Sequence, residues 1–166
     1  MKKHPWYYKL TYIYTWPWDL ISWFVILLFW VLWGTKLHWQ YGLWFEFKKG
    51  SWPTRTWYKK WAGSTLGHGG FLAPGYSGKE GMDTSTEFHE NVHSKQYEVA
   101  MLQSFVLAVS IILFTHACIF GGFVWLSGGF LPYCLAMLQA KLRGEAVYYG
   151  NILEESAYAQ EDLRSK

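Results

Sequence analysis

Residues 87–98 read EFHENVHSKQYE, and the sequence continues to Phe105 without a glycine or a proline. Such an uninterrupted run favours a helix. Thr84, followed by Glu87 three residues later, fits a capping box that binds the free N–H groups at a helix start. We therefore predict a helix that begins near Thr84 and runs on past Glu98.

Within this helix, His93 comes four residues after His89, and Glu90 directly follows the first histidine. Residues i and i+4 lie on the same face of a helix, so both imidazoles can reach one metal ion. A zinc ion takes two such nitrogens and a third protein ligand, and it keeps a fourth position for water. Glu90 is placed to take a proton from that water, which then attacks an amide carbonyl. The pattern predicts a zinc site with His89 and His93 as ligands and Glu90 as the catalytic base.

An apolar stretch, LISWFVILLFWVLWGT, precedes this region and contains no ionisable residue from Leu20 to Thr35. As a helix it is about 24 Å long, somewhat short of a hydrocarbon core of about 30 Å. No small-x-small cleavage site follows it, so we favour a retained transmembrane helix over a cleaved signal peptide. Tryptophans at both ends extend the helix as interfacial anchors: Trp16, Trp18, Trp30 and Trp33.

A second apolar stretch follows the histidines, because no Asp, Glu, Lys or Arg occurs between Glu98 and Lys141. As a single helix this stretch would extend about 63 Å, twice the thickness of a bilayer. We predict that residues 99–140 turn back as a hydrophobic helical hairpin or a re-entrant pair. Glycine clusters at residues 121–122 and 127–129 are the expected breaks.

The composition also indicates a membrane protein. Only 16% of the residues are charged, against about 25% in an ordinary soluble domain, and the 12 tryptophans suit a membrane–water interface. The net charge of +3 comes from scattered lysines and gives no reason to expect a nucleic-acid partner. Cys118, Cys134 and His116 lie in uncharged sequence, and we expect all three to be buried.

Residues 42–82 differ in composition from the apolar stretches. GLWFEFKK alternates in polarity, GSWP is typical of a turn, and aromatic, threonine and glycine residues follow, which predicts two or three short strands and a Gly/Pro loop. The polar C-terminal tail is expected to hold one more helix from about Asn151. The fold class is therefore an α+β membrane protein. We divide it into residues 1–40, a tail and transmembrane helix, and residues 41–166, which include the hydrophobic segment 99–140.

The third zinc ligand has to come from outside the histidine helix. Glu154, in the segment NILEESAY, can project from a second helix and complete a His/His/Glu set. Glu155 is the alternative ligand. In a rival interpretation, Asn151 and Glu154 form a capping box of their own helix, and Glu154 binds no metal.

The order of these motifs resembles a group of small bacterial membrane-associated proteins with a zincin-like HExxH site. That group usually reads TLGH, HExVHxxQYE, a hydrophobic segment ending in LRG, and NPFExxAY, and this chain reads TLGH, HENVHSKQYE, FLPYCLAMLQAKLRG and NILEESAY. The resemblance covers roughly residues 52–160 and is most specific in the second motif. It implies a minimal zincin-like fold with a short sheet on the active-site helix and Glu154 as the third ligand. Ile152 stands where the group has proline, which removes a helix-start signal but no ligand.

The same resemblance draws attention to His68, Gln96 and Glu98. His68 either acts as a catalytic residue that hydrogen-bonds the substrate or the developing oxyanion, or makes a structural hydrogen bond within its loop. Gln96, seven residues after His89, lies on the same helix face and is expected to support the ligands through hydrogen bonds. Glu98 is expected to anchor the helix in neighbouring groups.

Two functions are consistent with these residues. The first is a zinc metallopeptidase, an enzyme of the bacterial cytoplasmic membrane that contacts lipid and hydrolyses peptide or protein substrates with metal-activated water. The second is a catalytically silent subunit of a larger membrane complex that keeps a zincin-like fold for structure. In the simplest structural interpretation, His89 and His93 only occupy the polar face of a surface helix. Ionisable groups beside a bilayer are costly unless they are paired or ligated, which favours the zinc enzyme.

Overall fold

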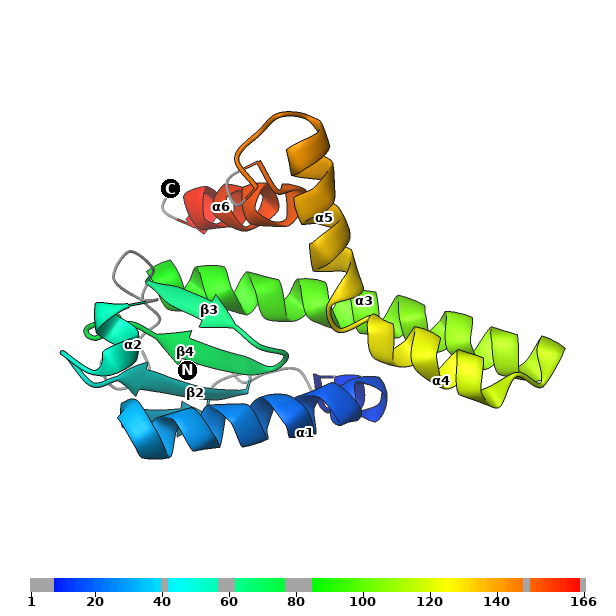
Figure 1. The fold of residues 1–166 in the computed structure, drawn as a ribbon, viewed down its shortest axis with the longest axis horizontal. Coiled ribbons are helices and arrows are strands. Elements are labelled where there is room, and N and C mark those ends of the chain that lie inside the picture. Colours follow the sequence, from blue (N-terminus) through cyan, green and yellow to red (C-terminus); the bar gives the residue numbers. More distant parts are fainter. Residues whose placement is uncertain (1–7, 40–41, 57–61, 77–84, 148–149, 165–166) are drawn as a thin grey trace. The chain divides into compact units, whose positions relative to one another are not determined.

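The computed structural model describes residues 8–39, 42–56, 62–76, 85–147 and 150–164 (Figure 1). The capping residue expected at position 84 lies outside these ranges. The described helices are α1 Tyr8–Trp33, α2 Trp52–Arg55, α3 Ser85–Thr115, α4 Cys118–Ser127, α5 Leu131–Leu142 and α6 Ile152–Arg164. The described strands are β1 Gly34–Trp39, β2 Leu43–Phe47, β3 Gly63–Thr65 and β4 Gly69–Leu72.

The fold is α+β, with a small sheet and two long apolar helices, which confirms the predicted class at this coarse level. The stretches Lys9–Trp33 of α1 and Phe88–Thr115 of α3 are each long and apolar enough to cross a membrane. Helices α4 and α5 meet that criterion only as a pair, with a bend of 58° between them. The described part of the chain therefore contains two candidate membrane spans, or three if the bent pair counts as one.

Helix α1 joins the sheet without a connecting loop. It begins at Tyr8, well before the predicted start at Leu20, and it ends at Trp33. Strand β1 starts at the next residue, Gly34, and the N–H of Lys48 donates a hydrogen bond of 2.7 Å to the Trp33 carbonyl. The sequence did not predict this junction, because the uncharged run gives no turn signal there.

The strands form one mixed sheet in the order β1-β2-β4-β3. Strand β1 pairs antiparallel with β2, β2 pairs parallel with β4, and β3 pairs antiparallel with β4. The sequence predicted two or three strands from residue 42 onward. The additional strand is β1, an edge strand formed by residues that were assigned to the end of the transmembrane helix and to the segment after it.

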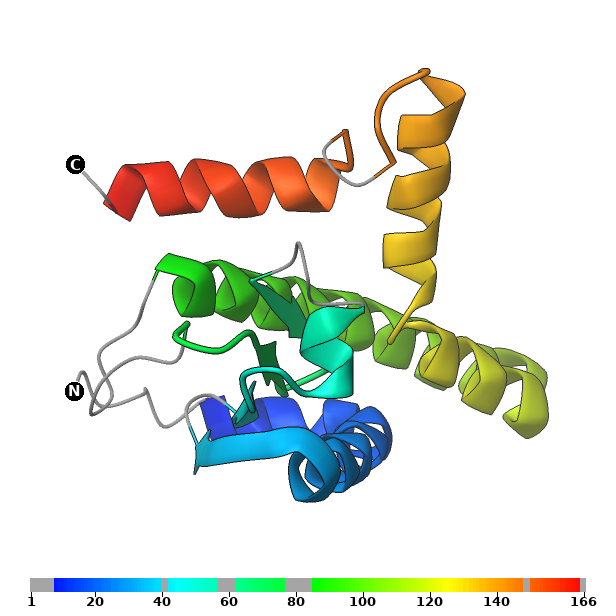
Figure 2. The ribbon, with the colours of Figure 1, turned by 60° about the vertical axis from the view of Figure 1, so that its left-hand side comes forward.

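The second half of α1 packs against the sheet (Figure 2). Ile26 of α1 is fully buried in one cluster with Phe45 and Phe47 of β2. Burial of apolar surface stabilises a fold by about 25 cal/mol per Å², so this aromatic cluster holds the helix on the strands. The partly buried residues packed around it are Trp23, Phe29, Trp30, Trp33, Leu37, Leu43 and Phe71.

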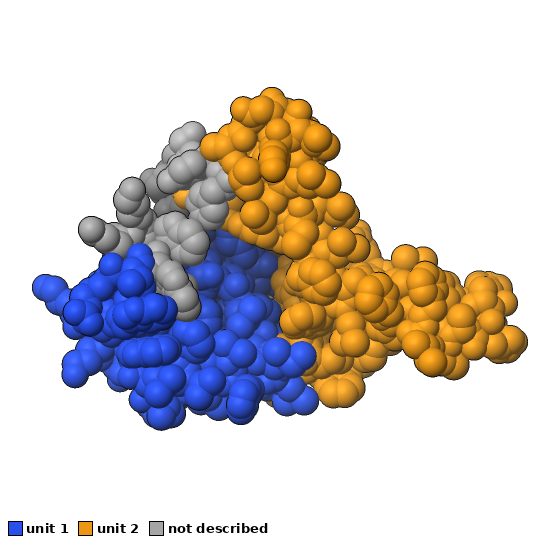
Figure 3. All heavy atoms as spheres, in the orientation of Figure 1, with its two compact units in different colours: residues 1–3, 19–94 blue, residues 4–18, 95–166 orange. Residues whose placement is uncertain are grey.

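The chain divides into two compact units (Figure 3). One contains Asp19–Ser94 and therefore the whole sheet, and the other contains Lys95–Lys166 together with the part of α1 that ends at Trp18. Both long helices pass from one unit to the other, so each of these two candidate spans is divided between the units. The predicted boundary at residue 40 does not coincide with this division.

Helices α3 and α4 form the antiparallel hairpin expected within residues 99–140 (Figure 2). The position of a Cβ on Gly121 lies 2.5 Å from Ile112 Cγ1 and 3.0 Å from the Ala108 carbonyl oxygen, and a Cβ on Gly128 would meet Ser104. Small residues at such positions let two helix backbones approach closely, which is the usual basis of helix packing in membranes.

The hairpin turns at a different place from the one predicted. Helix α3 ends at Thr115, and His116 takes a left-handed backbone conformation with φ of 56°. Residues 121–122 lie inside α4, so the first expected break is wrong, because Gly121 serves close packing rather than a turn. The second expected break is found, since α4 ends at Ser127 and α5 begins at Leu131.

Cys118, Cys134 and His116, which were expected to be buried, are not buried inside the protein. Both cysteine thiols are free and exposed, and the histidine is exposed at the hairpin turn. An apolar side chain of a membrane protein can meet lipid instead of protein, so an uncharged neighbourhood in the sequence does not imply burial inside the fold.

We predict that Gly121→Ala destabilises the hairpin by about 1–3 kcal/mol, because the added methyl group overpacks the contact with Ile112. Gly122→Ala is the matched control, since no atom lies within 4 Å of its Cβ position. That control should be neutral or stabilising by up to about 1 kcal/mol, as alanine favours a helix over glycine. Thermal unfolding of both variants in detergent measures the difference, and equal melting temperatures would contradict the packing.

Candidate metal centre

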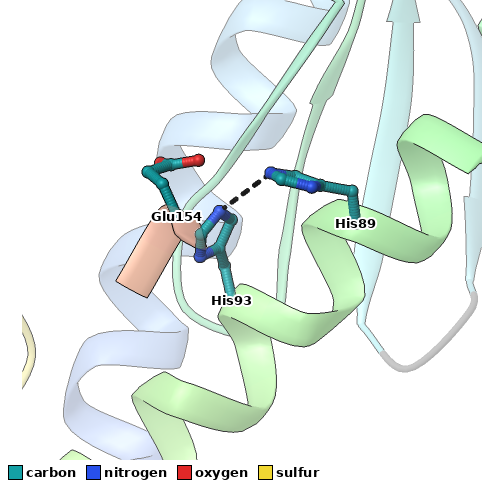
Figure 4. A group of neighbouring side chains, drawn as sticks. All are labelled: His89, His93 and Glu154. Atoms are coloured by element: carbon teal, nitrogen blue, oxygen red, sulfur yellow. Dashed lines mark hydrogen bonds between the residues drawn. The ribbon is translucent and has the colours of Figure 1, made fainter. Parts of the chain in front are cut away.

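His89 and His93 lie one turn apart on α3 and point to the same side of the helix (Figure 4). Their Nε2 atoms are 3.2 Å apart, and the rings meet edge to face at 80°. His89 is buried and His93 is partly buried. The helix therefore presents two imidazole nitrogens at one point.

The nitrogen pair has the spacing that a tetrahedral zinc ion requires. Two nitrogens bound to one such ion at about 2.0–2.1 Å are about 3.3 Å apart. The observed 3.2 Å agrees with that value. The same distance allows one ring to donate a hydrogen bond to the other, according to the tautomer. The geometry therefore fits zinc but does not require it.

Glu90 is held beside the histidines by the edge strand β3. Its side chain is 5% exposed, and the hydroxyl of Thr65 lies 2.6 Å from its Oε2 atom. The same hydroxyl lies 2.9 Å from the Glu90 carbonyl oxygen, so one donor serves both the backbone and the side chain of this residue. Hydrogen bonds to an ionised group are stronger than neutral ones, and this bond fixes the direction of the carboxylate.

Gly63 leaves the space in which this carboxylate lies. A Cβ at that position would come within 3.2 Å of three Glu90 side-chain atoms: Cγ, Oε1 and Cδ. No real Cβ contact tolerates the shortest of these distances, 2.9 Å, without a shift. Glycine at position 63 of β3 therefore leaves the space that the Glu90 side chain occupies.

His68 is completely buried and pairs with Asp19 of α1. Its Nδ1 atom lies 2.9 Å and 3.0 Å from the two carboxylate oxygens, and its backbone N–H donates to the same carboxylate. Of the two roles considered from the sequence, this geometry favours the structural hydrogen bond, because the ring has no exposed surface to offer a substrate. The catalytic role assigned to His68 gains no support from it.

The loop Thr65–His68 is tied to both long helices. The Ser94 hydroxyl of α3 donates to the Gly67 carbonyl at 3.1 Å, next to the bond between His68 and Asp19. The indole N–H of Trp23 donates to the His68 carbonyl at 3.0 Å. The loop thus fixes α1 and the start of α3 to the sheet.

Glu154 lies in the first turn of α6 and is buried, whereas Glu155 is exposed. The hydroxyl of Tyr133 in α5 donates a hydrogen bond of 2.7 Å to Glu154 Oε1. The side-chain oxygen of Asn151 accepts from the N–H of Leu153, so Asn151 caps the helix as expected. Burial and a fixed orientation make Glu154 a better ligand candidate than Glu155.

Gln96 anchors the start of α6 on α3. Its side-chain amide donates to the Leu153 carbonyl at 2.8 Å and to the Ser156 hydroxyl at 2.6 Å. Gln96 is three residues after His93 on the same continuous helix. These two bonds anchor the backbone next to Glu154 and do not reach a side chain of the three candidate ligands.

Among the described residues, one group of side chains offers the donors for a metal ion: His89, His93 and Glu154 (Figure 4). One ligand atom from each lies within 4.8 Å of the others. Two imidazole nitrogens and one carboxylate oxygen form a set typical of catalytic zinc. The chemistry of the donors therefore fits zinc. The Asn151 bond to the Leu153 N–H is the part of the rival capping interpretation that is observed, whereas Glu154 Oε1 accepts from Tyr133 of another helix.

Asp19, Thr65 and Tyr133 all contact predicted site residues, although no pattern in the sequence predicted a role for them. The position of Asp19 directly before the uncharged run that starts at Leu20 was a usable signal, because a buried carboxylate needs a partner. Thr65 belongs to the quoted TLGH motif, which was read for its histidine alone. No local pattern distinguishes Tyr133 from the other tyrosines.

Comparison of the chain with protein-family models, with curated proteins and with solved structures finds no match.

We predict that Asp19→Leu destabilises the protein by about 3 kcal/mol, because removal of one partner leaves a buried polar group without its hydrogen bond. Asp19→Asn keeps an acceptor for the His68 ring and should cost clearly less. Lys36→Met is the comparison for a pair with one exposed partner, since the Lys36 side chain is 61% exposed and that of Glu46 is 9% exposed. It should cost less than Asp19→Leu, because the Glu46 carboxylate keeps its bond from the Gly75 N–H. Denaturant unfolding in detergent measures all three, and an equal loss in Asp19→Leu and Lys36→Met would refute the structural role of the pair.

Proposed function

We propose that this chain is a membrane-embedded zinc-dependent metallopeptidase. His89, His93 and Glu154 are the residues that would hold the ion, and Glu90 is the base. The hydrogen bond between Gln96 and the Leu153 carbonyl supports the proposal, because it ties the helix that carries Glu154 to the helix that carries the histidines.

The observation that carries the proposal is that Glu90, the residue next to His89 in the chain, is buried and bonded to the edge strand β3. A glutamate that serves only to solubilise a helix would point into water, whereas Glu90 is buried and held by Thr65. A bound zinc ion would supply a Lewis acid that polarises a carbonyl and makes water a better nucleophile. Glu90 would accept the proton from that water and deliver it to the leaving amine. Peptide or protein segments near the membrane surface are the proposed substrates.

The second candidate is a catalytically silent subunit of a larger membrane complex. The burial of His89 and Glu90, each 5% exposed, favours it, because a polypeptide substrate has little access to them in this conformation. Both candidates share the metal ligands, so metal content alone does not separate them. The two differ in what Glu90 does.

We predict that Glu154→Gln weakens zinc binding by at least about 100-fold, while Glu155→Gln leaves it unchanged. Partners outside the coordination shell already cost 10–100-fold, so the loss of a ligand costs at least as much. His38→Ala in β1 controls for zinc bound by other histidines. Elemental analysis and titration of the purified protein with zinc alone measure the affinity. Equal effects of the two glutamine variants would contradict Glu154 as the ligand.

We predict that Glu90→Gln keeps zinc near one ion per chain but lowers peptide hydrolysis by about 100- to 10,000-fold, the contribution of a general base. A fluorescence-quenched peptide library with the protein in lipid vesicles is the assay. Hydrolysis that survives in Glu90→Gln would refute the assigned role of the glutamate. Zinc-loaded wild-type protein without hydrolysis would support the silent subunit instead.

A further inference from the structure

From Asp19 onward, α1 has two different faces. On one face, Asp19, Ser22 and Ile26 are buried at helical spacing. The opposite face is exposed and entirely apolar, with Phe24 at 69% and Val31 at 72% exposure. The other members of this outer face are Leu20, Ile21, Leu27, Leu28 and Leu32.

The inner face is covered by the sheet along most of its length. The residues of α1 in the aromatic cluster extend from Trp23 to Trp33, and their partners belong to β1, β2 and β4. Exposed cationic side chains lie on the edge strand β1, in the turn after β2 and in α2: Lys36, Lys48, Lys49 and Arg55. The edge and flanks of the sheet are therefore suited to water, although the sheet packs on a helix that is apolar enough to cross a membrane.

This arrangement is incompatible with a crossing by the second half of α1. β1 and β3 are the outer strands of the sheet, and among the described strands each is paired on one side only. Backbone groups without partners cost several kcal/mol each in hydrocarbon, so open sheet edges do not occur at that depth. A helix segment packed on such a sheet must therefore lie at the membrane surface. There its outer face can contact lipid while the sheet edges stay outside the hydrocarbon.

We propose that residues 20–32 of α1 lie in the plane of the membrane interface, with the outer face immersed in lipid and the sheet facing water. Lipid is the occupant that the observations favour, because no ionisable residue occurs from Leu20 to Thr35 and the outer face continues the apolar surface of a candidate span. The lysines at positions 36, 48 and 49 follow the helix end, where they can meet anionic headgroups. This inference is independent of the proposed peptidase activity.

The experiment measures the depth of three outer-face positions in a bilayer. Nitroxide labels are attached at Leu20→Cys, Phe24→Cys and Val31→Cys after both native cysteines are replaced by alanine, and the protein is placed in phosphatidylcholine–phosphatidylglycerol vesicles. Oxygen and a water-soluble nickel chelate report depth through their effects on the spin label. Val99, Val106 and Leu113, exposed on the candidate span of α3, provide comparison positions on another apolar helix.

We expect the three labels on α1 to lie at one shallow depth, within about 4 Å of each other. A crossing helix would separate Leu20 from Val31 by about 16 Å at 1.5 Å per residue, and such a gradient would overturn the proposal. Labels that neither reagent reaches would also overturn it, because a second copy or another protein would then cover the face. Retention of the wild-type melting temperature confirms that each labelled protein is folded.

Discussion

The loop Thr65–His68 is the constraint on which the first compact unit depends. Its side chains and carbonyls bond to α1 through Asp19 and Trp23 and to α3 through Glu90 and Ser94. These bonds join parts of the chain that are 25 to 49 residues apart. Because every partner is at least partly buried, loss of one bond leaves a polar group in an apolar environment, which costs more than the bond itself contributes.

This constraint explains how an aromatic-rich chain holds polar residues in fixed directions. Apolar packing between α1 and the sheet is strong but has little directional preference. The hydrogen bonds from Thr65 to Glu90 and from His68 to Asp19 supply the direction, and they lie at the two ends of one short loop. The second unit combines apolar packing and directional hydrogen bonds in the same way. There, Tyr133 and Gln96 orient the start of α6 within a largely apolar set of helices.

The features that the sequence predicted well are local ones. The spacing of His89 and His93 depends only on the geometry of a helix turn, and the cap at Asn151 depends on its own next residues. The contacts of Asp19, Thr65 and Tyr133 are set by the tertiary fold, so no spacing rule finds them. Composition also does not reveal that β1 begins within the uncharged run that was predicted to be helical up to Thr35.

The direct junction between Trp33 and Gly34 removes any hinge between a lipid-facing helix and the sheet. The Lys48 N–H bond to the Trp33 carbonyl braces this junction from the neighbouring turn. The helix axis and the strands consequently tilt together. A change of bilayer thickness or curvature that rocks the second half of α1 must rotate the whole sheet, and with it the strand edge that holds Glu90.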